Sequence, residues 1–278
     1  MRSDMAPVPL TLEAEIRIDD GMEGELSVGK TIIAGGDQYA LYILKSEVST
    51  GRVAQGERAV SFVKISAILD VAHEVAFVRR SAIIKENTTL SAIYRAAGAK
   101  LSAIDADFPV SRFYCPVGDT PTFPIARALQ EAGGIVRWRA GKMQFIRLPD
   151  LFKQKAVVDI QSGDTEAATS GFVERHSVPW FFSLSPSGEV VHGSREKARS
   201  VRYVPFKNEQ QLRNMSRCLV HRKKAKLDYS ERLCAGDLVN VVGGDKLAIV
   251  TAVHVFSSGT EGETPDQYSR LWLASMEE

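Results

Sequence analysis

The sequence has few cysteines and no long apolar run. Three cysteines, Cys115, Cys218 and Cys234, occur in 278 residues, an odd number without a CxxC pair. This argues against a disulfide framework and is typical of a reducing compartment. No run approaches the roughly 18 apolar residues of a membrane-spanning helix, and the N-terminus lacks the apolar segment of a signal peptide. We therefore expect a soluble protein that does not insert into membranes and is intracellular when made.

Net charge is also nearly absent. The 35 Lys and Arg residues and 34 Asp and Glu residues leave a formal charge of +1. The chain as a whole therefore has no electrostatic attraction to nucleic acid or to acidic membranes. A hydrophobic content of 44% is ordinary for a folded protein, and the length allows two domains or one domain with an insert. No repeat with a period of about 20–50 residues is found.

Catalytic and metal-binding patterns are missing as well. The chain has no HExxH, HxH, Cys/His zinc spacing or G-x-S-x-G elbow. Cys218 and His221 are three residues apart but supply two metal ligands at most. The pair Asp105 and Asp107 is better explained as a turn former than as an acid and a base. We predict no catalytic residue, no metal site and no cofactor, hence no enzyme.

One motif does match a nucleotide-binding pattern. Residues 24–31, GELSVGKT, satisfy G-x-x-x-x-G-K-[ST], with Gly24, Gly29, Lys30 and Thr31 at the fixed positions. A P-loop needs a buried strand before it and a sustained helix after it, because the helix N-terminus holds the phosphates. Here the preceding strand is amphipathic, and glycines break the following segment after about one turn. A hairpin turn is favoured, and nucleotide binding, with Lys30 on phosphate and Thr31 on magnesium, is the alternative.

Strand patterns fill the first and last parts of the chain. Leu10–Ile18 alternates apolar and polar residues as a half-buried antiparallel strand does. Strand-like runs follow at Tyr39–Val48 and Ala59–Leu69, a pattern typical of a small barrel or sandwich. A polar linker is predicted at Gln161–Gly171.

Beyond that linker, the β pattern resumes. Hairpins are predicted around Pro186-Ser187-Gly188 and Gly243-Gly244-Asp245, a mobile segment at Ser257–Gln267 and a last strand at Leu271–Ala274. Leu219, Ala225, Leu227 and Tyr229 keep one parity and are expected on one face of a strand.

The central part has a mixed pattern. Thr88–Ala97 is predicted to be a helix with Thr88 as its N-cap and Gly98 as its stop. A second helix carries an apolar stripe of Ile125, Ala128, Leu129 and Ala132, with Pro124 in its first turn and Gly133 ending it.

A hairpin is expected directly after this second helix. If Ala140-Gly141 forms a two-residue turn, Trp138 faces Met143, Val136 faces Phe145 and Arg137 faces Gln144. Alanine is a poor first residue for such a turn, so a longer loop is the alternative.

The pattern R-x-L-x-E-x-G-G-x-V-x-W-x-x-G-x-M-x-F, from Arg127 to Phe145, resembles a segment of phage tail hub proteins of the late-control D type. Those proteins are related to the hub part of type VI secretion spikes. The resemblance implies a mainly β (α+β) fold with two β-barrel-like domains, 1–78 and 153–278, flanking a small α/β insert, 79–152.

The resemblance also implies a function. Hubs of this family form rings of three, in which two similar domains per chain match the sixfold tail tube. The chain would thus be a structural virion protein of a baseplate or tail tip, assembled in the host cytoplasm. It would join the hexameric tube to a trimeric spike around a central channel that DNA passes at most non-specifically. The chain is shorter than larger family members, which leaves open whether the spike is a separate chain and whether the hub is a siphophage tail-tip or transposable-phage variant.

Two further stretches suggest contacts. Residues 195–232 contain 12 Lys and Arg against four Asp and Glu, a local charge of +8. This is typical either of a nucleic-acid-binding β-barrel module or of a protein interface, and the interface or a solvated face is favoured, because Tyr203, Phe206 and Tyr229 fall on expected core faces. In Val178–Phe182, VPWFF, three consecutive aromatics cannot all face one core, so at least one is expected to point outward, at a protein interface. A fold that covers both sheet faces is the alternative.

Overall fold

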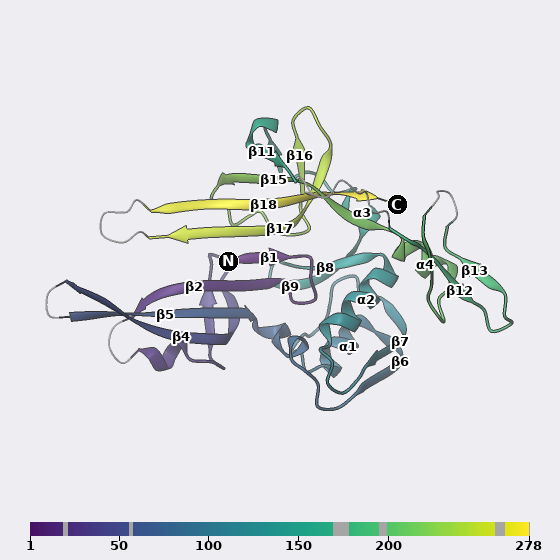
Figure 1. The fold of residues 1–278 in the computed structure, drawn as a ribbon, viewed down its shortest axis with the longest axis horizontal. Coiled ribbons are helices and arrows are strands. Elements are labelled where there is room, and N and C mark those ends of the chain that lie inside the picture. The colour runs from purple at the N-terminus through teal and green to yellow at the C-terminus, as the bar shows by residue number, and fades with distance from the viewer. Residues whose placement is uncertain (19–21, 56–57, 169–177, 195–198, 259–264, 278) are drawn as a thin grey trace.

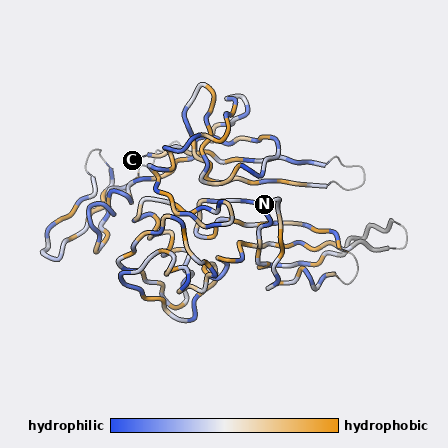
Figure 2. Tube along the Cα trace, turned by 180° about the vertical axis from the view of Figure 1, so that it is seen from behind, coloured by the Kyte–Doolittle hydropathy of each residue, from blue (hydrophilic) through white to orange (hydrophobic). Residues whose placement is uncertain are grey.

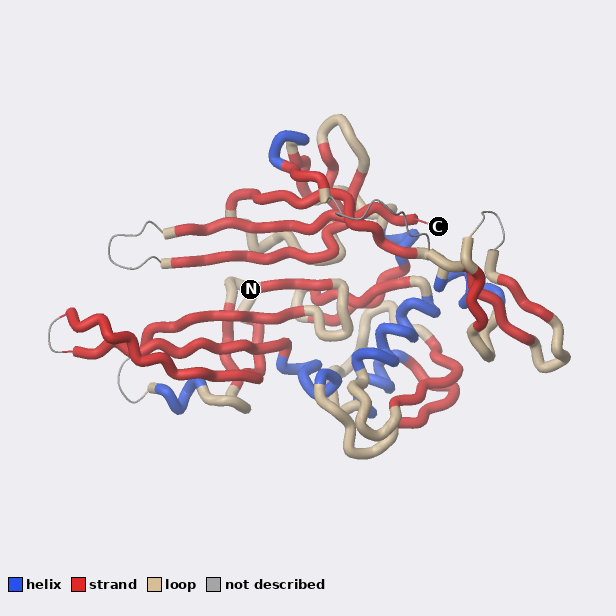
Figure 3. Tube along the Cα trace, in the orientation of Figure 1, coloured by secondary structure: helices blue, strands red, loops and turns tan. Residues whose placement is uncertain are grey.

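The computed structural model describes the chain apart from residues 19–21, 56–57, 169–177, 195–198, 259–264 and 278, and it gives only the backbone for the rest of 50–60. Strands dominate the molecule, and the longest helix lies in its central part (Figure 3). This confirms the mainly β fold. Within the described residues, no helix has the length and apolar character needed to cross a membrane.

The first β unit consists of β2 (Leu10–Ile18), the 3-10 helix η1 (Glu23–Leu26), β3 (Thr31–Ala34), β4 (Tyr39–Gln55) and β5 (Arg58–Leu69). Its strands are antiparallel in the order β2-β5-β4-β3. Along β2, Glu13, Glu15 and Arg17 are exposed, as the alternation predicts. β4 is longer than predicted, because pairing with β5 continues at Gly51 and again at Gln55.

The second β unit repeats this topology. It consists of β15 (Cys218–Asp228), β16 (Leu238–Val241), β17 (Lys246–Ser257) and β18 (Asp266–Glu277), paired antiparallel in the order β15-β18-β17-β16. In both units the third strand carries a bulge near its start, after Ile43 in β4 and after Ile249 in β17. The long hairpins β4–β5 and β17–β18 extend on the same side of the molecule (Figure 1). The hairpin around Gly243-Gly244-Asp245 is confirmed, and the last strand is longer than predicted.

One 11-stranded sheet runs through both units. β1 (Arg2–Asp4) joins them, because it pairs antiparallel with β17 on one side and with β2 on the other. β11 (Thr165–Ala167) forms the far edge on β15, and β10 (Val158–Ile160) pairs parallel with β16. The sheet therefore joins strands of the two predicted parts 1–78 and 153–278, while β6–β9 of the part between them form separate sheets. The division into domains stays a prediction.

Two expectations in this region are corrected. The predicted linker at 161–171 contains η3 (Ser162–Asp164) and β11, and its residues 169–171 lie outside the described part, as does most of the segment expected to be mobile at 257–267. Leu219 does not share a face with Ala225 and Leu227. A bulge between His221 and Lys223 reverses the alternation, so Leu219 joins a different apolar cluster from Ala225.

The central insert holds most of the helical structure. The 3-10 helix η2 (Asp70–Ala76) precedes it. Its elements are β6 (Ile83–Thr89), α1 (Leu90–Ala96), β7 (Pro109–Cys115), α2 (Thr122–Ala132), β8 (Gly134–Arg139), β9 (Lys142–Arg147) and α3 (Leu148–Leu151). Thr89 caps α1 in place of Thr88, because Thr88 still pairs with Val110 of β7 while the Thr89 hydroxyl accepts from the Ala92 N–H. Leu90, Ile93, Tyr94 and Ala97 are buried, as the predicted helix requires.

The predicted helix and hairpin of the insert are confirmed. Gly133 ends α2 at φ 72°, and β8 pairs with β9 in the predicted register. The connection is the two-residue turn, with Ala140 at φ 48° and Gly141 at φ 73°. Ala140 therefore adopts the left-handed conformation that this turn requires, although alanine disfavours it, and the longer loop does not form.

A small separate sheet lies beside the insert (Figure 1). β12 (Trp180–Leu184) pairs with β13 (Val190–His192) and β14 (Val201–Tyr203), which confirms the hairpin around Pro186-Ser187-Gly188. Phe181 packs with Leu212 and Met215 of α4 (Glu209–Met215), while Phe182 contacts Tyr203 on the opposite face. Trp180 is buried as well, so the outward aromatic of this strand is the half-buried Phe182.

The apolar cores follow the strand alternation. The largest cluster joins the inner face of the first unit to the insert, and a second cluster fills the second unit. Apolar and polar positions intermix along the strands of both units (Figure 2), as expected for sheets with one buried and one solvated face.

Candidate functional site

The residues of the P-loop match lie in a turn of the first unit. Gly24 belongs to η1, Gly29 adopts φ 91°, and Thr31 is the first residue of β3. Lys30 is exposed, and a strand rather than a helix follows it. The helix N-terminus that holds phosphate in a P-loop is therefore not present at this position.

The same turn recurs in the second unit. The Gly29 N–H donates to Ile43 O and the Ile43 N–H to Lys30 O, at 3.0 and 2.9 Å. In the second unit, the Gly236 N–H donates to Ile249 O and the Ile249 N–H to Asp237 O, both at 2.9 Å. The segments LSVGK at 26–30 and LCAGD at 233–237 are thus structural equivalents, with an aspartate where the P-loop lysine stands.

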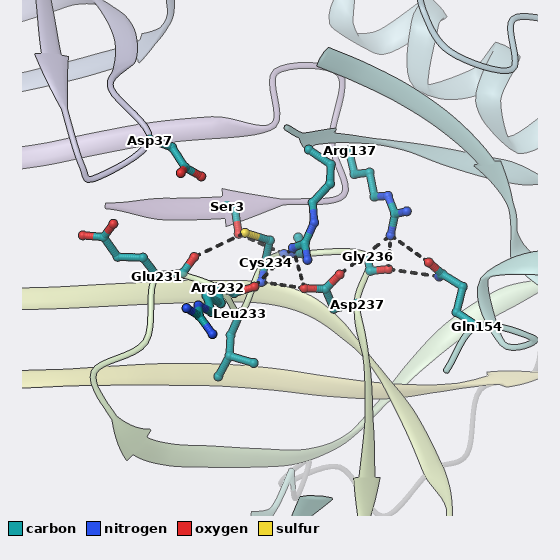
Figure 4. A network of polar contacts seen from close by, with 12 residues as sticks. Ser3, Asp37, Arg137, Gln154, Glu231, Arg232, Leu233, Cys234, Gly236 and Asp237 are labelled. Atoms are coloured by element: carbon teal, nitrogen blue, oxygen red, sulfur yellow. Dashed lines mark hydrogen bonds and ion pairs between the residues drawn. The ribbon is translucent and has the colours of Figure 1, made fainter. Parts of the chain in front are cut away.

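In the second unit this turn belongs to a buried ionic network (Figure 4). Asp237, with 5% of its side chain exposed, lies 2.8 Å from Arg139 Nη1 and 3.9 Å from Arg137 Nη1. Its carboxylate also accepts the Cys234 N–H at 3.0 Å. Both arginines project from β8, so the network fastens the insert hairpin to the second unit.

Arg137 is the centre of this network. Its Nη1 donates to Gly236 O at 2.6 Å and to Gln154 Oε1 at 3.1 Å, and its Nε donates to Gln144 Oε1 at 3.2 Å. Burial lowers the pKa of Arg137. Burial also raises the pKa of Asp237, and the Cys234 N–H and the two guanidinium groups oppose this shift only in part. The network thus holds a desolvated carboxylate in place. Sequence patterns do not reveal it, because Arg139 precedes Asp237 by 98 residues.

The basic residues of 195–232 are spread over several elements. Residues 195–198 lie outside the described part. Lys207 lies 2.7 Å from Glu131, Arg222 pairs with Glu277, and the Lys223 ammonium donates to Thr165 at 3.0 Å. Several of the basic side chains in this region therefore have partners within the chain. Tyr203 and Phe206 are 51% and 83% exposed, so the expectation that both belong to a core is wrong.

Other chemistry-bearing side chains are scattered. Within the described residues, no three His, Cys, Asp or Glu side chains gather as metal ligands, and the three cysteines are free. His73 stacks on Tyr42 with ring centroids 4.1 Å apart. His254 is buried, and its ring nitrogens lie 2.9 Å from Ser269 Oγ and 3.0 Å from Leu233 O. Both histidines thus have structural partners.

Comparison with known proteins identifies the fold. No protein-family model and no curated protein matches the sequence. The chain is similar in structure to a tail protein from Neisseria meningitidis MC58, with a TM-score of 0.64 and 13% identity over 99% of this chain and 90% of that one. It is also similar to the 43 kDa tail protein of prophage MuSo2 from Shewanella oneidensis, with a TM-score of 0.60 and 13% identity over 98% and 92%.

A further similarity extends to secretion systems. The E. coli c3393 protein, a type VI secretion component described as similar to the T4 tail proteins gp27 and gp5, gives a TM-score of 0.52 and 10% identity over 98% of this chain and 71% of that one. The chain therefore has the fold of phage tail proteins and of type VI spike-related proteins, as the resemblance of residues 127–145 implies.

Proposed function

We propose that the chain is a structural, non-enzymatic tail protein that forms the hub of a baseplate or tail tip. Three copies form a ring that joins a hexameric tail tube to a trimeric spike around a central channel. The similarity in fold to tail proteins supports this role. In this proposal Gly24, Gly29, Lys30 and Thr31 form a structural turn rather than a nucleotide site.

The observation that carries the proposal is the duplicated β unit. Each chain holds two units with the same strand order, the same bulge and the same turn. A ring of three such chains presents six similar units. That is the geometry an adaptor needs, because a threefold object then offers a near-sixfold surface to a hexameric tube.

The solvated face of the sheet supports a channel. Directly paired residues share a face, so one row runs from Lys226 through Arg270 and Val253 to Arg2 and Thr11. The same face continues on β2 with the exposed residues Glu13, Glu15 and Arg17. Its charges are of both signs, which suits a water-filled lumen that DNA passes without specific contacts.

The other partners follow from the same proposal. The barrel-like parts 1–78 and 153–278 contact the tube. The protein resides in the virion tail after assembly in the host cytoplasm.

Mass in solution tests the ring. Light scattering over a concentration series is expected to give three times the 30.5 kDa of one chain. A mass that corresponds to two or four chains at every concentration would contradict the proposal, since neither presents six equivalent units.

A further inference from the structure

The second unit has a covered edge that the first unit lacks. Strand β1 covers the edge of β17: Met1 and His254 exchange both backbone hydrogen bonds, at 2.7 and 2.8 Å. The Ser3 hydroxyl also accepts the Ala235 N–H at 2.9 Å. Ala235 and His254, which form these hydrogen bonds with residues 1–3, are only 2% and 4% exposed.

The equivalent edge of the first unit is open. The shared bulge and turn align Ile43 with Ile249 and Gly29 with Gly236. Val28 is then the counterpart of Ala235, and Val48 the counterpart of His254. Val28 and Val48 are 59% and 55% exposed, and no described strand pairs with β4 beyond Tyr42 on the side that β3 occupies. Two apolar side chains are thus uncovered where the duplicate unit carries a strand.

The chain also has a counterpart of β1 whose second edge pairs with no strand among the described residues. Both β1 and β11 are three residues long and pair antiparallel with the first strand of their unit, on its outer edge. Leu273 and Ala67 are equivalent, because they pair with Ile249 and Ile43. Lys223 pairs with Leu273 and Leu12 with Ala67, so Lys223 is the counterpart of Leu12. Ala167 pairs with Lys223. Arg2 pairs with Thr11, so Met1 lies opposite Leu12. Ala167 therefore corresponds to Met1.

The backbone of β11 is oriented for a second partner. The Ala168 N–H donates to Arg222 O of β15 at 2.9 Å. Because neighbouring residues of a strand direct their backbone groups to opposite sides, the N–H and C=O of Ala167 point away from β15. Met1 directs its own groups toward His254 in the same way. An exposed strand edge of this kind is a template for pairing with another chain.

We propose that β11 of one copy pairs antiparallel with the open edge of β4 in the next copy, with Ala167 opposite Val48. The contact repeats between copies the β1–β17 pairing that joins the two units within one chain. It covers Val48 with a strand and makes the sheet continuous from copy to copy. It rests on the proposed function for the closure of three copies into a ring.

A disulfide between strands tests this register. Ser49 and Glu166 would form the neighbouring non-hydrogen-bonded pair, whose Cα atoms lie about 4.5 Å apart, within reach of a disulfide. In one chain these residues lie on β4 and β11, seven strand spacings apart along the sheet, or roughly 34 Å. A bridge in the double variant Ser49→Cys/Glu166→Cys must therefore join two copies. Mild oxidation and a non-reducing gel are expected to show linked dimers and closed trimers.

The controls use the same background of native cysteines. Each single variant shows whether Cys115, Cys218 or Cys234 reacts with the new thiol. The double variant Glu15→Cys/Glu166→Cys is the matched control, because Glu15 is exposed on the same face but lies on the interior strand β2. None of these three control variants is expected to form linked dimers or trimers.

Proline provides a second measurement. Ala167→Pro removes one N–H that points to the open edge and leaves the β11–β15 bonds intact. Loss of this hydrogen bond is expected to weaken self-association on the order of tenfold, while Ala167→Ser leaves it unchanged. Unchanged thermal unfolding of the monomer would show that the proline variant is folded.

The outcomes separate this pairing from the proposed function. If the wild-type protein is a trimer but the Ser49–Glu166 pair does not link and the proline variant associates normally, the pairing is wrong and the hub proposal stands. If linked dimers form in a protein whose mass never reaches three chains, the pairing holds and the ring of three fails. No linking in a protein that stays monomeric at every concentration contradicts both.

Discussion

Alanine in place of Gly29 or Gly236 separates the backbone role of the duplicated turn from the role of the ionic network. Both glycines have positive φ, 91° and 88°, so alanine at either position costs about 1–2 kcal/mol of folding free energy. At Gly29 an added Cβ meets only Tyr42 Oη at 3.7 Å, an ordinary contact. At Gly236 it lies 2.5 Å from Arg137 Cδ, so Arg137 must move.

The displacement of Arg137 adds to the loss at Gly236. Its guanidinium leaves Gly236 O and Asp237, and a hydrogen bond to a charged group contributes about 1.5–3 kcal/mol. We expect Gly236→Ala to destabilise the protein by about 2.5–5 kcal/mol and Gly29→Ala by about 1–2 kcal/mol.

Thermal unfolding of the two variants beside the wild type measures this difference. At about 2–4 °C per kcal/mol, Gly236→Ala should unfold at least about 3 °C below Gly29→Ala. Equal unfolding temperatures would refute the assignment of a stabilising role to Arg137. A larger loss at Gly29 would refute the equivalence of the two turns.

Three further predictions concern charge and ligands. Asp237→Asn removes the carboxyl group whose pKa burial raises in the folded protein. Because the folded wild type binds that proton more tightly than the unfolded chain does, wild type should lose stability relative to the variant as pH rises from about 4 through the folded pKa. Urea unfolding at several pH values measures this, and a pH-independent difference would contradict it. Calorimetry with ATP and GTP should detect no binding to wild type or to Lys30→Ala, because no helix follows the turn; micromolar binding that depends on Lys30 would restore the P-loop interpretation. Neutralising Arg222, Lys223 and Lys224 should leave a DNA mobility shift at low salt unchanged, because two of these cations already have partners in the chain; a salt-dependent shift that the variant loses would favour a nucleic-acid-binding module.

Local patterns predicted the insert well. The helix stripe, the left-handed Gly133 and the register of β8 with β9 depend on residues within about one turn or one hairpin of each other. The alternation along β2 was predictable for the same reason. The P-loop match could be discounted locally as well, because glycines follow it after about one turn and a strand, β3, takes the place of the required helix.

Long-range features were not predictable from the sequence. The two units lie about 207 residues apart and are separated by the insert, so a search at short periods does not find them. Their clearest shared signals, LxxGx and a glycine pair, are too short to stand out. The pairing of β1 with β17 and the contact of Arg137 with Asp237 join distant residues and leave no local pattern. The bulge at Arg222 likewise reverses the parity that Leu219, Ala225 and Leu227 share in the sequence.

Negative-stain imaging of the purified protein tests the central claim most directly. Two equivalent units in each of three chains predict class averages of a ring with six similar lobes around a central hole. Rings with three lobes would contradict the equivalence of the two units, and particles of trimeric mass without a hole would contradict the channel.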